Sequence, residues 1–109
     1  MENDKHGREE FSRLTSINRL VHEPARLMIL ACLYVVKSGD FTFLLHQTGL
    51  TWGNLSSHLS RLEEAGYVVI EKTFKGRKPR TMLHLTGNGR AAFRTYREQM
   101  KQVLDDFPK

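Results

Sequence analysis

Polar residues capable of directional hydrogen bonding cluster between positions 51 and 61. Asn54, Ser57 and Arg61 follow one another at spacings of three and four, which places their side chains on one face of a helix. An amide can pair with the edge of adenine through two hydrogen bonds, a guanidinium can do so with guanine, and a hydroxyl group can bond to several base edges. The spacing therefore predicts a helical surface that reads the bases of a nucleic acid.

Other residues of this segment are suited to supporting roles. Thr51 and Gly53 lie at the expected start of the helix, where free N–H groups and the helix dipole attract phosphate. Ser56 and Ser60 are small either because they contact DNA or because helix packing demands small side chains. His58 is expected to be a packed or capping imidazole rather than a ligand. We count the first four as candidate DNA contacts and leave His58 out.

The net charge of the chain comes from one short stretch. The 109 residues contain 17 Lys and Arg and 12 Asp and Glu, which gives a net charge of +5. Residues 72–80 contain five basic and no acidic residues, so the rest of the chain is balanced. A localised basic segment is typical of phosphate contacts, although a solvated hairpin tip would have the same composition. The candidate phosphate contacts are Lys75, Arg77, Lys78 and Arg80, with Arg77 also suited to a minor groove.

The residue types expected in an enzyme or a metal protein do not form a pattern here. Cys32, the single cysteine, cannot form an internal disulfide and is expected to be buried. The five histidines lack the spacing that places two ligands on one helix face. We find no glycine-rich phosphate loop, nucleophile elbow or paired catalytic carboxylates. The sequence therefore predicts no enzymatic activity, no cofactor and no metal.

The hydrophobic pattern predicts a single helical domain of residues 11–109 after a flexible tail of residues 1–10. Apolar residues at helical spacing predict a first helix that ends before Pro24, namely Phe11, Leu14, Ile17, Leu20 and Val21. A second helix is expected over residues 24–37, with Pro24 in its first turn and Gly39 at its stop. A third is expected over residues 42–48, ending at Gly49.

The second half of the chain predicts a helix, a hairpin and a last helix. Thr51 is expected to cap a helix over residues 52–65 that ends at Gly66, with Trp52 covering the core. Strands are expected at residues 67–74 and 81–85, joined by a long charged tip stiffened by Pro79, with Phe74 packed under the hairpin. A final helix over residues 87–106 follows a cap at Thr86.

The last helix carries an apolar seam with alternating spacings of three and four residues, as in a coiled coil. This seam is a candidate dimer contact, although packing onto its own chain would use the same pattern. Its members are Phe93, Tyr96, Met100, Val103 and Phe107.

The order of helix, turn, helix and basic hairpin predicts a winged helix-turn-helix, mainly α with a small β-hairpin, that is, a three-helix core plus wing. The sequence resembles the small winged-helix regulators of bacteria and archaea, close to the MarR-type and ArsR-type transcription factors. The resemblance covers roughly four fifths of the chain and is carried by residues 22–27 (HEPARL), 48–59 (TGLTWGNLSSHL), 62–68 (LEEAGYV), 76–81 (GRKPRT) and 85–86 (LT).

This resemblance implies a homodimeric transcription factor with N- and C-terminal dimerisation helices. It further implies that the dimer binds a palindromic double-stranded DNA operator through its third core helix. The chain is shorter than the larger MarR-type proteins and lacks the paired cysteines of ArsR-type metal sensors, so no effector ligand is indicated. The chain opens without an apolar leader, and its longest apolar run of ten residues is too short for a membrane span. We therefore expect a cytoplasmic protein. The competing hypothesis is a protein-interaction adaptor that uses the same scaffold in a larger assembly.

Overall fold

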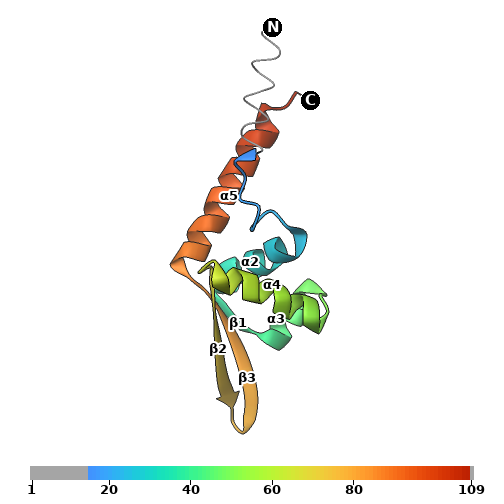
Figure 1. Ribbon diagram of the computed structural model, residues 1–109, viewed down its shortest axis with the longest axis vertical. Helices are drawn as coiled ribbons and strands as arrows, with labels where there is room; N and C mark the ends of the chain where they lie inside the picture. The colour runs from blue at the N-terminus through green and yellow to red at the C-terminus, as the bar shows by residue number, and fades with distance from the viewer. Residues whose placement is uncertain (1–14, 109) are drawn as a thin grey trace.

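The computed structural model describes residues 15–108 and has the mainly helical fold with a small antiparallel sheet that the sequence predicts (Figure 1). Three helices contribute most of the core; a long hairpin extends from one side of it, and a last helix extends in the opposite direction. The elements in chain order are α2 (Pro24–Val36), β1 (Ser38–Asp40), α3 (Phe41–Thr48), α4 (Trp52–Glu64), β2 (Val68–Lys75), β3 (Lys78–Leu85) and α5 (Gly87–Asp106).

Local capping chemistry sets the helix boundaries. Asp40 accepts a hydrogen bond from the backbone N–H of Phe43 at 2.8 Å and begins α3, and Thr51 accepts one from Asn54 at 3.2 Å and begins α4. Gly49 ends α3 with a φ of 69°, a left-handed conformation that favours glycine. The turn of the helix-turn-helix is therefore defined at both ends, as predicted.

The core lies where α2, α3 and α4 meet the sheet. Leucines from all three helices have no exposed surface, and they pack against Leu83 of β3 and Val68 of β2. Burial of such side chains stabilises the fold by about 1.5–3 kcal/mol each. The fully buried leucines of the helices are Leu30, Leu33, Leu44, Leu55 and Leu62.

The sheet has the strand order β1-β3-β2, and all its pairs are antiparallel. The prediction of a long hairpin tip is wrong, because Lys75 pairs directly with Lys78 and only Gly76 and Arg77 form the turn. Gly76 has a φ of 65°, and such a residue permits a two-residue hairpin turn. Pro79 belongs to β3, where its missing N–H is tolerated because β1 pairs only with residues 82–84.

The first helix predicted to end before Pro24 does not extend through residues 16–23. Phe11 and Leu14 lie outside the described residues, and residues 16–23 form turns. Asn18 accepts backbone hydrogen bonds from Leu20 at 3.0 Å and from Val21 at 3.3 Å. This side chain offers the backbone an alternative to a helix.

The stop of α2 also differs from the prediction. Lys37, with a φ of 71°, ends α2, and Gly39 lies in β1. A Cβ atom at Gly39 would lie 2.7 Å from the ring of Phe43, so close packing rather than helix termination explains the glycine. The three-residue β1 was not predicted, because its register depends on β3, about 45 residues away.

Candidate nucleic-acid interface

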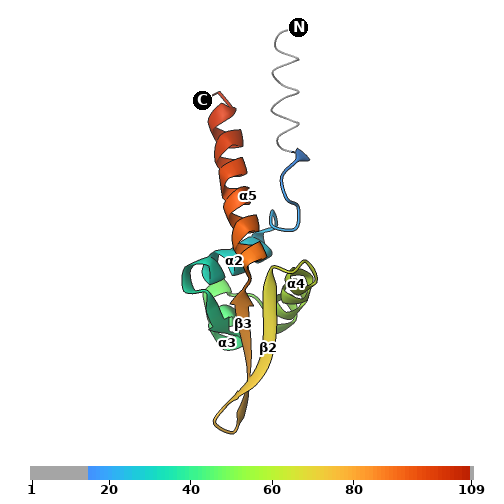
Figure 2. The same ribbon diagram turned by 90° about the vertical axis from the view of Figure 1, so that its left-hand side faces the viewer.

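Helix α4 has one buried face and one polar exposed face. Leu55, Leu59 and Leu62 are buried against the core, whereas the opposite side is open to solvent. Figure 2 shows α4 on one side of the hairpin and α2 and α3 on the other. All the candidate DNA-contact residues of this segment are exposed, namely Thr51, Gly53, Asn54, Ser56, Ser57, Ser60 and Arg61. The structure thus gathers them on one accessible element.

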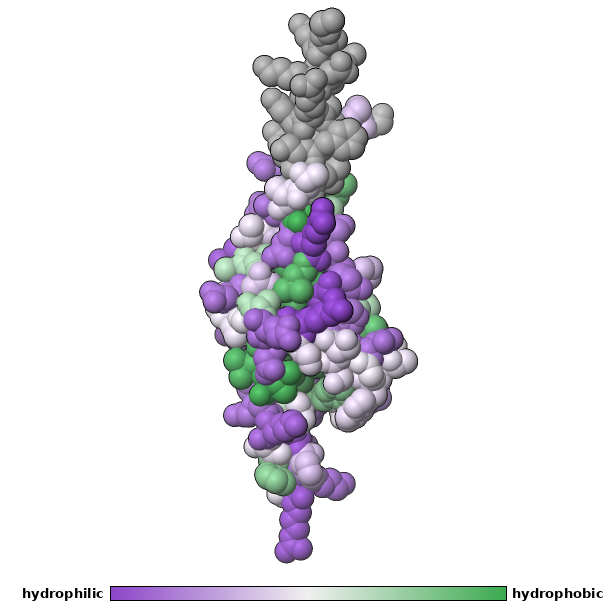
Figure 3. Space-filling view, viewed as in Figure 1, coloured by the Kyte–Doolittle hydropathy of each residue, from purple (hydrophilic) through white to green (hydrophobic). Residues whose placement is uncertain are grey.

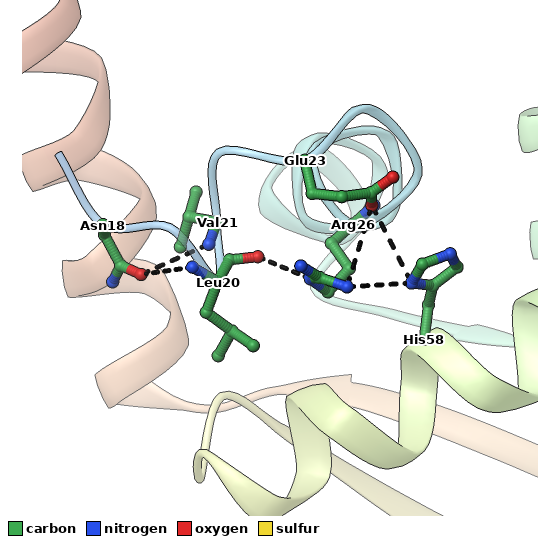
Figure 4. A network of polar contacts seen from close by, with 6 residues as sticks. All are labelled: Asn18, Leu20, Val21, Glu23, Arg26 and His58. Carbon is green, nitrogen blue, oxygen red and sulfur yellow. Dashed lines mark hydrogen bonds and ion pairs between the residues drawn. The ribbon is translucent and has the colours of Figure 1, made fainter.

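A buried arginine connects α4 to α2 and to the turns before it (Figure 4). Arg26, only 8% exposed, donates a hydrogen bond through Nε to the carbonyl of Leu20 at 2.6 Å. Its Nη1 lies 3.1 Å from Nδ1 of His58 on α4. His58 is therefore a packed imidazole, as expected from the sequence, and it helps fix the orientation of the helix that carries the polar face.

Glu23 is the carboxylate of this network. It caps α2 by accepting a hydrogen bond from the N–H of Arg26 at 2.8 Å, and its Oε2 lies 3.8 Å from His58. Burial alone would raise the pKa of Glu23, but the backbone hydrogen bonds of Arg26 and Ala25 and the charges of His58 and Arg26 outweigh it and lower this pKa. The charged form of Glu23 is therefore stabilised in the folded protein.

Three of the four predicted phosphate contacts lie at the tip of the hairpin. Lys75, Arg77 and Lys78 are exposed, and no acidic residue among those described pairs with them. Figure 3 shows a mostly hydrophilic surface at this end of the molecule and a paler, near-neutral surface over α4. Unpaired cations on a projecting hairpin can approach a polyanion at little desolvation cost.

The structure separates Arg80 from these three residues. Arg80 pairs across the hairpin with Thr73 and is half-buried. It lines a hollow of about 290 Å³ with Phe43 and Met82, on the side of the sheet away from α4. Its Nε is buried without a partner among the described residues.

A larger hollow of about 670 Å³ lies between α4 and the hairpin. Its lining includes Trp52 and Ser60 from the helix and Lys72 and Thr81 from the hairpin. Trp52 covers the core only in part, because its ring contacts that of the core residue Phe41 at 4.2 Å between centroids while Trp52 itself stays 67% exposed. Helical spacing alone could not show this, since position 52 lies at the exposed start of α4.

Phe74 was expected under the hairpin but is 69% exposed. It lies next to the tip, opposite Pro79 and two residues from Lys72, so Phe74 and Lys72 share a face of β2. Neither Lys72 nor Phe74 was among the predicted sites. The sequence signal that could have identified them is their spacing of two residues on a strand that leads to the basic tip.

The apolar seam of α5 is divided between the chain's own core and the surface. Tyr96 and Val103 are buried, and the hydroxyl of Tyr96 lies 2.7 Å from Nδ1 of His22. The ring of Phe93 contacts Tyr34 on α2 at 4.9 Å. The other seam positions, Met100 and Phe107, are half-buried and 39% exposed respectively, and Leu104 beside them is 65% exposed.

The described residues contain no helix that is both long enough and apolar enough to cross a membrane. Residues 25–104 match the model of a family described as a winged helix DNA-binding domain. The chain is 34% identical over 85 residues to the uncharacterized protein MJ0432 of Methanocaldococcus jannaschii, an alignment that covers 78% of this chain and 92% of that protein.

Solved structures show the same fold. A transcriptional regulator homologue from Pyrococcus horikoshii OT3 is 30% identical and superposes with a TM-score of 0.81 over 89% of this chain and 95% of that one. The PcaV transcriptional regulator from Streptomyces coelicolor is 18% identical, with a TM-score of 0.71 over 94% and 75% of the two chains. A MarR-family regulator from Silicibacter pomeroyi is 24% identical, with a TM-score of 0.64 over 95% and 69%. The fold predicted from the resemblance to MarR-type regulators is thus confirmed, and the chain belongs to the family of winged-helix DNA-binding domains.

Proposed function

We propose that this protein is a homodimeric, sequence-specific transcriptional regulator in which α4 enters the major groove and the hairpin tip contacts the phosphate backbone. The observation that carries the proposal is that two exposed polar surfaces belong to neighbouring elements, α4 and the hairpin, which line one hollow between them. Asn54, Ser57 and Arg61 project from one face of α4, and the unpaired cations of the tip lie on the hairpin beside it. The first set can discriminate bases and the second can position the protein on the duplex.

The proposed dimer uses the exposed part of the α5 seam. Leu104 and Phe107 are open to solvent, and Met100 is half-buried. Because Tyr96 and Val103 are already buried within the chain, we assign them to the support of α5 rather than to direct contact with a second copy. A two-fold dimer predicts a palindromic site with half-sites about one helical turn apart, roughly 34–36 Å. The proposed place of action is the cytoplasm.

Selection of duplexes from a random DNA pool, followed by footprinting, tests this proposal. We expect a palindromic motif and an affinity that falls steeply with salt. The logarithm of the binding constant should fall with the logarithm of the salt concentration, with a slope of about −0.9 per phosphate contacted. Recovery of no duplex above background, or a salt-independent affinity, would contradict it. A stoichiometric protein partner in place of DNA would instead favour the adaptor. Against the adaptor, the α4 face offers Asn, Ser and Arg rather than the aromatic anchors typical of protein interfaces.

A pair of single substitutions separates base reading from positioning. Asn54→Ala should relax the preference at particular base pairs of the selected motif, by about 1–3 kcal/mol per lost bidentate contact. Arg77→Ala should weaken binding to all sequences alike and reduce the salt slope. Repeating the selection with each variant measures both effects. Identical motif changes in the two variants would show that the division of roles is wrong.

A further inference from the structure

A hollow of about 670 Å³ lies between α4 and the hairpin, and the proposed function leaves it without a role. The major and minor grooves of a duplex are separated by one sugar–phosphate strand. A protein that places a helix in one groove and a hairpin tip at the next must straddle that strand. The hollow is the space between the two elements.

We propose that this hollow holds one sugar–phosphate strand of the bound duplex, with Lys72 as its phosphate contact and Phe74 and Trp52 against the deoxyriboses. The proposal rests on the proposed function, since it assumes a duplex bound to α4 and the tip. It adds three contact residues to those predicted from the sequence and assigns a role to the exposed side chains of Trp52 and Phe74.

The chemistry of the lining suits this occupant. Lys72 faces α4 across the hollow and pairs along the hairpin with Thr81, and no described acidic residue forms an ion pair with it. The hydroxyl groups of Ser56, Ser60 and Thr81 line the same space. An ammonium group and several hydroxyl donors match the charge and the acceptor atoms of a phosphodiester.

The exposed aromatic residues suit the sugars between the phosphates. Trp52 is 67% and Phe74 is 69% exposed, and the first is held at an angle by Phe41 beneath it. Phe74 lies two residues beyond Lys72 on β2, toward the tip and on the same face of the hairpin. A strand that runs past Lys72 toward the tip would therefore cover the apolar surface of Phe74.

Glu63 limits where the strand can lie. Glu63 lines the same hollow, and its negative charge would repel a phosphate placed near the C-terminal half of α4. The strand must therefore pass on the side of Trp52 and Lys72. Removal of this charge by Glu63→Gln should tighten binding to every duplex.

Salt titrations with matched variants test the proposal, using the tightest duplex from the selection. Lys72→Ala should weaken binding about tenfold per subunit and reduce the salt slope by about 0.9 per subunit, whereas Lys72→Arg should retain the slope. Phe74→Ala should weaken binding with the slope unchanged. The controls are Lys101→Ala, an exposed lysine on α5, and Val69→Ala, a 50% exposed residue on the other face of β2, and both should bind like the wild type.

A methylphosphonate scan then locates the strand. Each duplex carries one neutral methylphosphonate in place of a phosphate. The losses of binding free energy caused by Lys72→Ala and by the neutral linkage should be non-additive only at certain phosphates. These phosphates lie between the major-groove positions protected by α4 and the minor groove at the tip. Wild-type binding with an unchanged slope in Lys72→Ala, or no coupling at any phosphate, would overturn this inference and leave the proposed function intact. The inference would also be overturned if the wild type bound benzoate, Lys72→Ala did not, and the salt dependence of DNA binding were the same in both proteins. That result would assign the hollow to small anions instead. Absence of DNA binding by the wild type would contradict the proposed function itself.

Discussion

The hairpin and α5 extend in opposite directions from the core (Figure 1). Each carries a group of cationic residues, and the two groups differ in their contacts within the chain. The hairpin tip presents Lys75, Arg77 and Lys78 without ion-pair partners among the described residues. The arginines of α5 are engaged by the chain itself. Arg90 lies 4.5 Å from the centroid of the Tyr34 ring and donates to the carbonyl of the same residue at 3.4 Å.

The remaining arginines of α5 follow the same pattern. A hydrogen bond with Arg94 lowers the pKa of Tyr34, with smaller contributions from the charges of Arg94, Arg97 and Arg90, and Arg97 lies 4.0 Å from Glu98. The two regions have similar residue types, so composition alone does not distinguish them. What distinguishes them is that the arginines of α5 have partners within the chain, whereas no described acidic residue pairs with the cations of the tip.

The largest expected effect compares removal of three cations from each region. The triple variant Lys75→Ala/Arg77→Ala/Lys78→Ala should bind the selected duplex at least about 100-fold more weakly near 0.2 M salt, with a slope reduced by about 5 per dimer. The matched triple Arg94→Ala/Arg97→Ala/Lys101→Ala removes the same charge from α5 and should change the slope by less than about 1. Fluorescence anisotropy across a salt series measures both. Equal losses would mean that net charge, and not the position of the cations, governs binding.

Arg26 extends the comparison to a cation that is buried and fully engaged. Arg26→Ala removes the donor to Leu20 and leaves Glu23 beside His58 without its guanidinium, so we expect a loss of about 2–4 kcal/mol in the free energy of unfolding. Arg97→Ala breaks only an exposed ion pair and should change this free energy by less than about 0.5 kcal/mol. Urea denaturation gives both values. If Arg26→Ala proved as stable as Arg97→Ala, the buried network would have no structural role.

Features that depend on a few neighbouring residues could be predicted from the sequence. Thr51, Gly49 and Pro24 act through backbone groups within four positions of themselves, and the helices they delimit were placed within one residue. The apolar stripe of α4 likewise identified its polar face, because helical periodicity is a local property. The winged-helix order followed from these elements.

Features that depend on distant pairing could not be predicted. Strand β1 exists because residues 38–40 meet β3, and Arg80 leaves the tip because Gly76 and Arg77 alone form the turn. The exposure of Phe74 has the same origin, since only the tertiary structure shows that no element covers it. Which side chains contact DNA remains a prediction, because such contacts also depend on groups that are distant in the sequence or belong to the DNA.

Two glycines at the start of α5 test what directs this helix away from the hairpin. A Cβ atom at Gly89 would clash with the backbone carbonyl oxygen of Tyr67 and lie 2.8 Å from Leu85 Cδ1, whereas one at Gly87 would meet no atom within 4 Å. Gly89→Ala should therefore lower the free energy of unfolding by about 1–3 kcal/mol. Gly87→Ala should leave it unchanged or raise it by up to about 1 kcal/mol. Thermal and urea unfolding distinguish them, and equal stability of the two variants would rule out this close contact as the constraint on α5.

The smallest expected effect concerns the acidic partner of Arg26 and depends on pH. Because the folded state lowers the pKa of Glu23 below its ordinary value of 4.5, the charged carboxylate stabilises the fold above that pH, and this contribution disappears as the pH falls through the lowered pKa. Glu23→Gln keeps an acceptor for the N–H of Arg26 but has no charge to lose. Its stability deficit, about 1 kcal/mol near pH 6, should therefore shrink toward pH 3 in urea denaturation. Glu98→Gln, in an exposed pair on α5, is the control and should differ from the wild type by less than about 0.5 kcal/mol. A deficit of Glu23→Gln that stays constant across this range would show that Glu23 acts only as a cap and that the charge of Arg26 is satisfied without it.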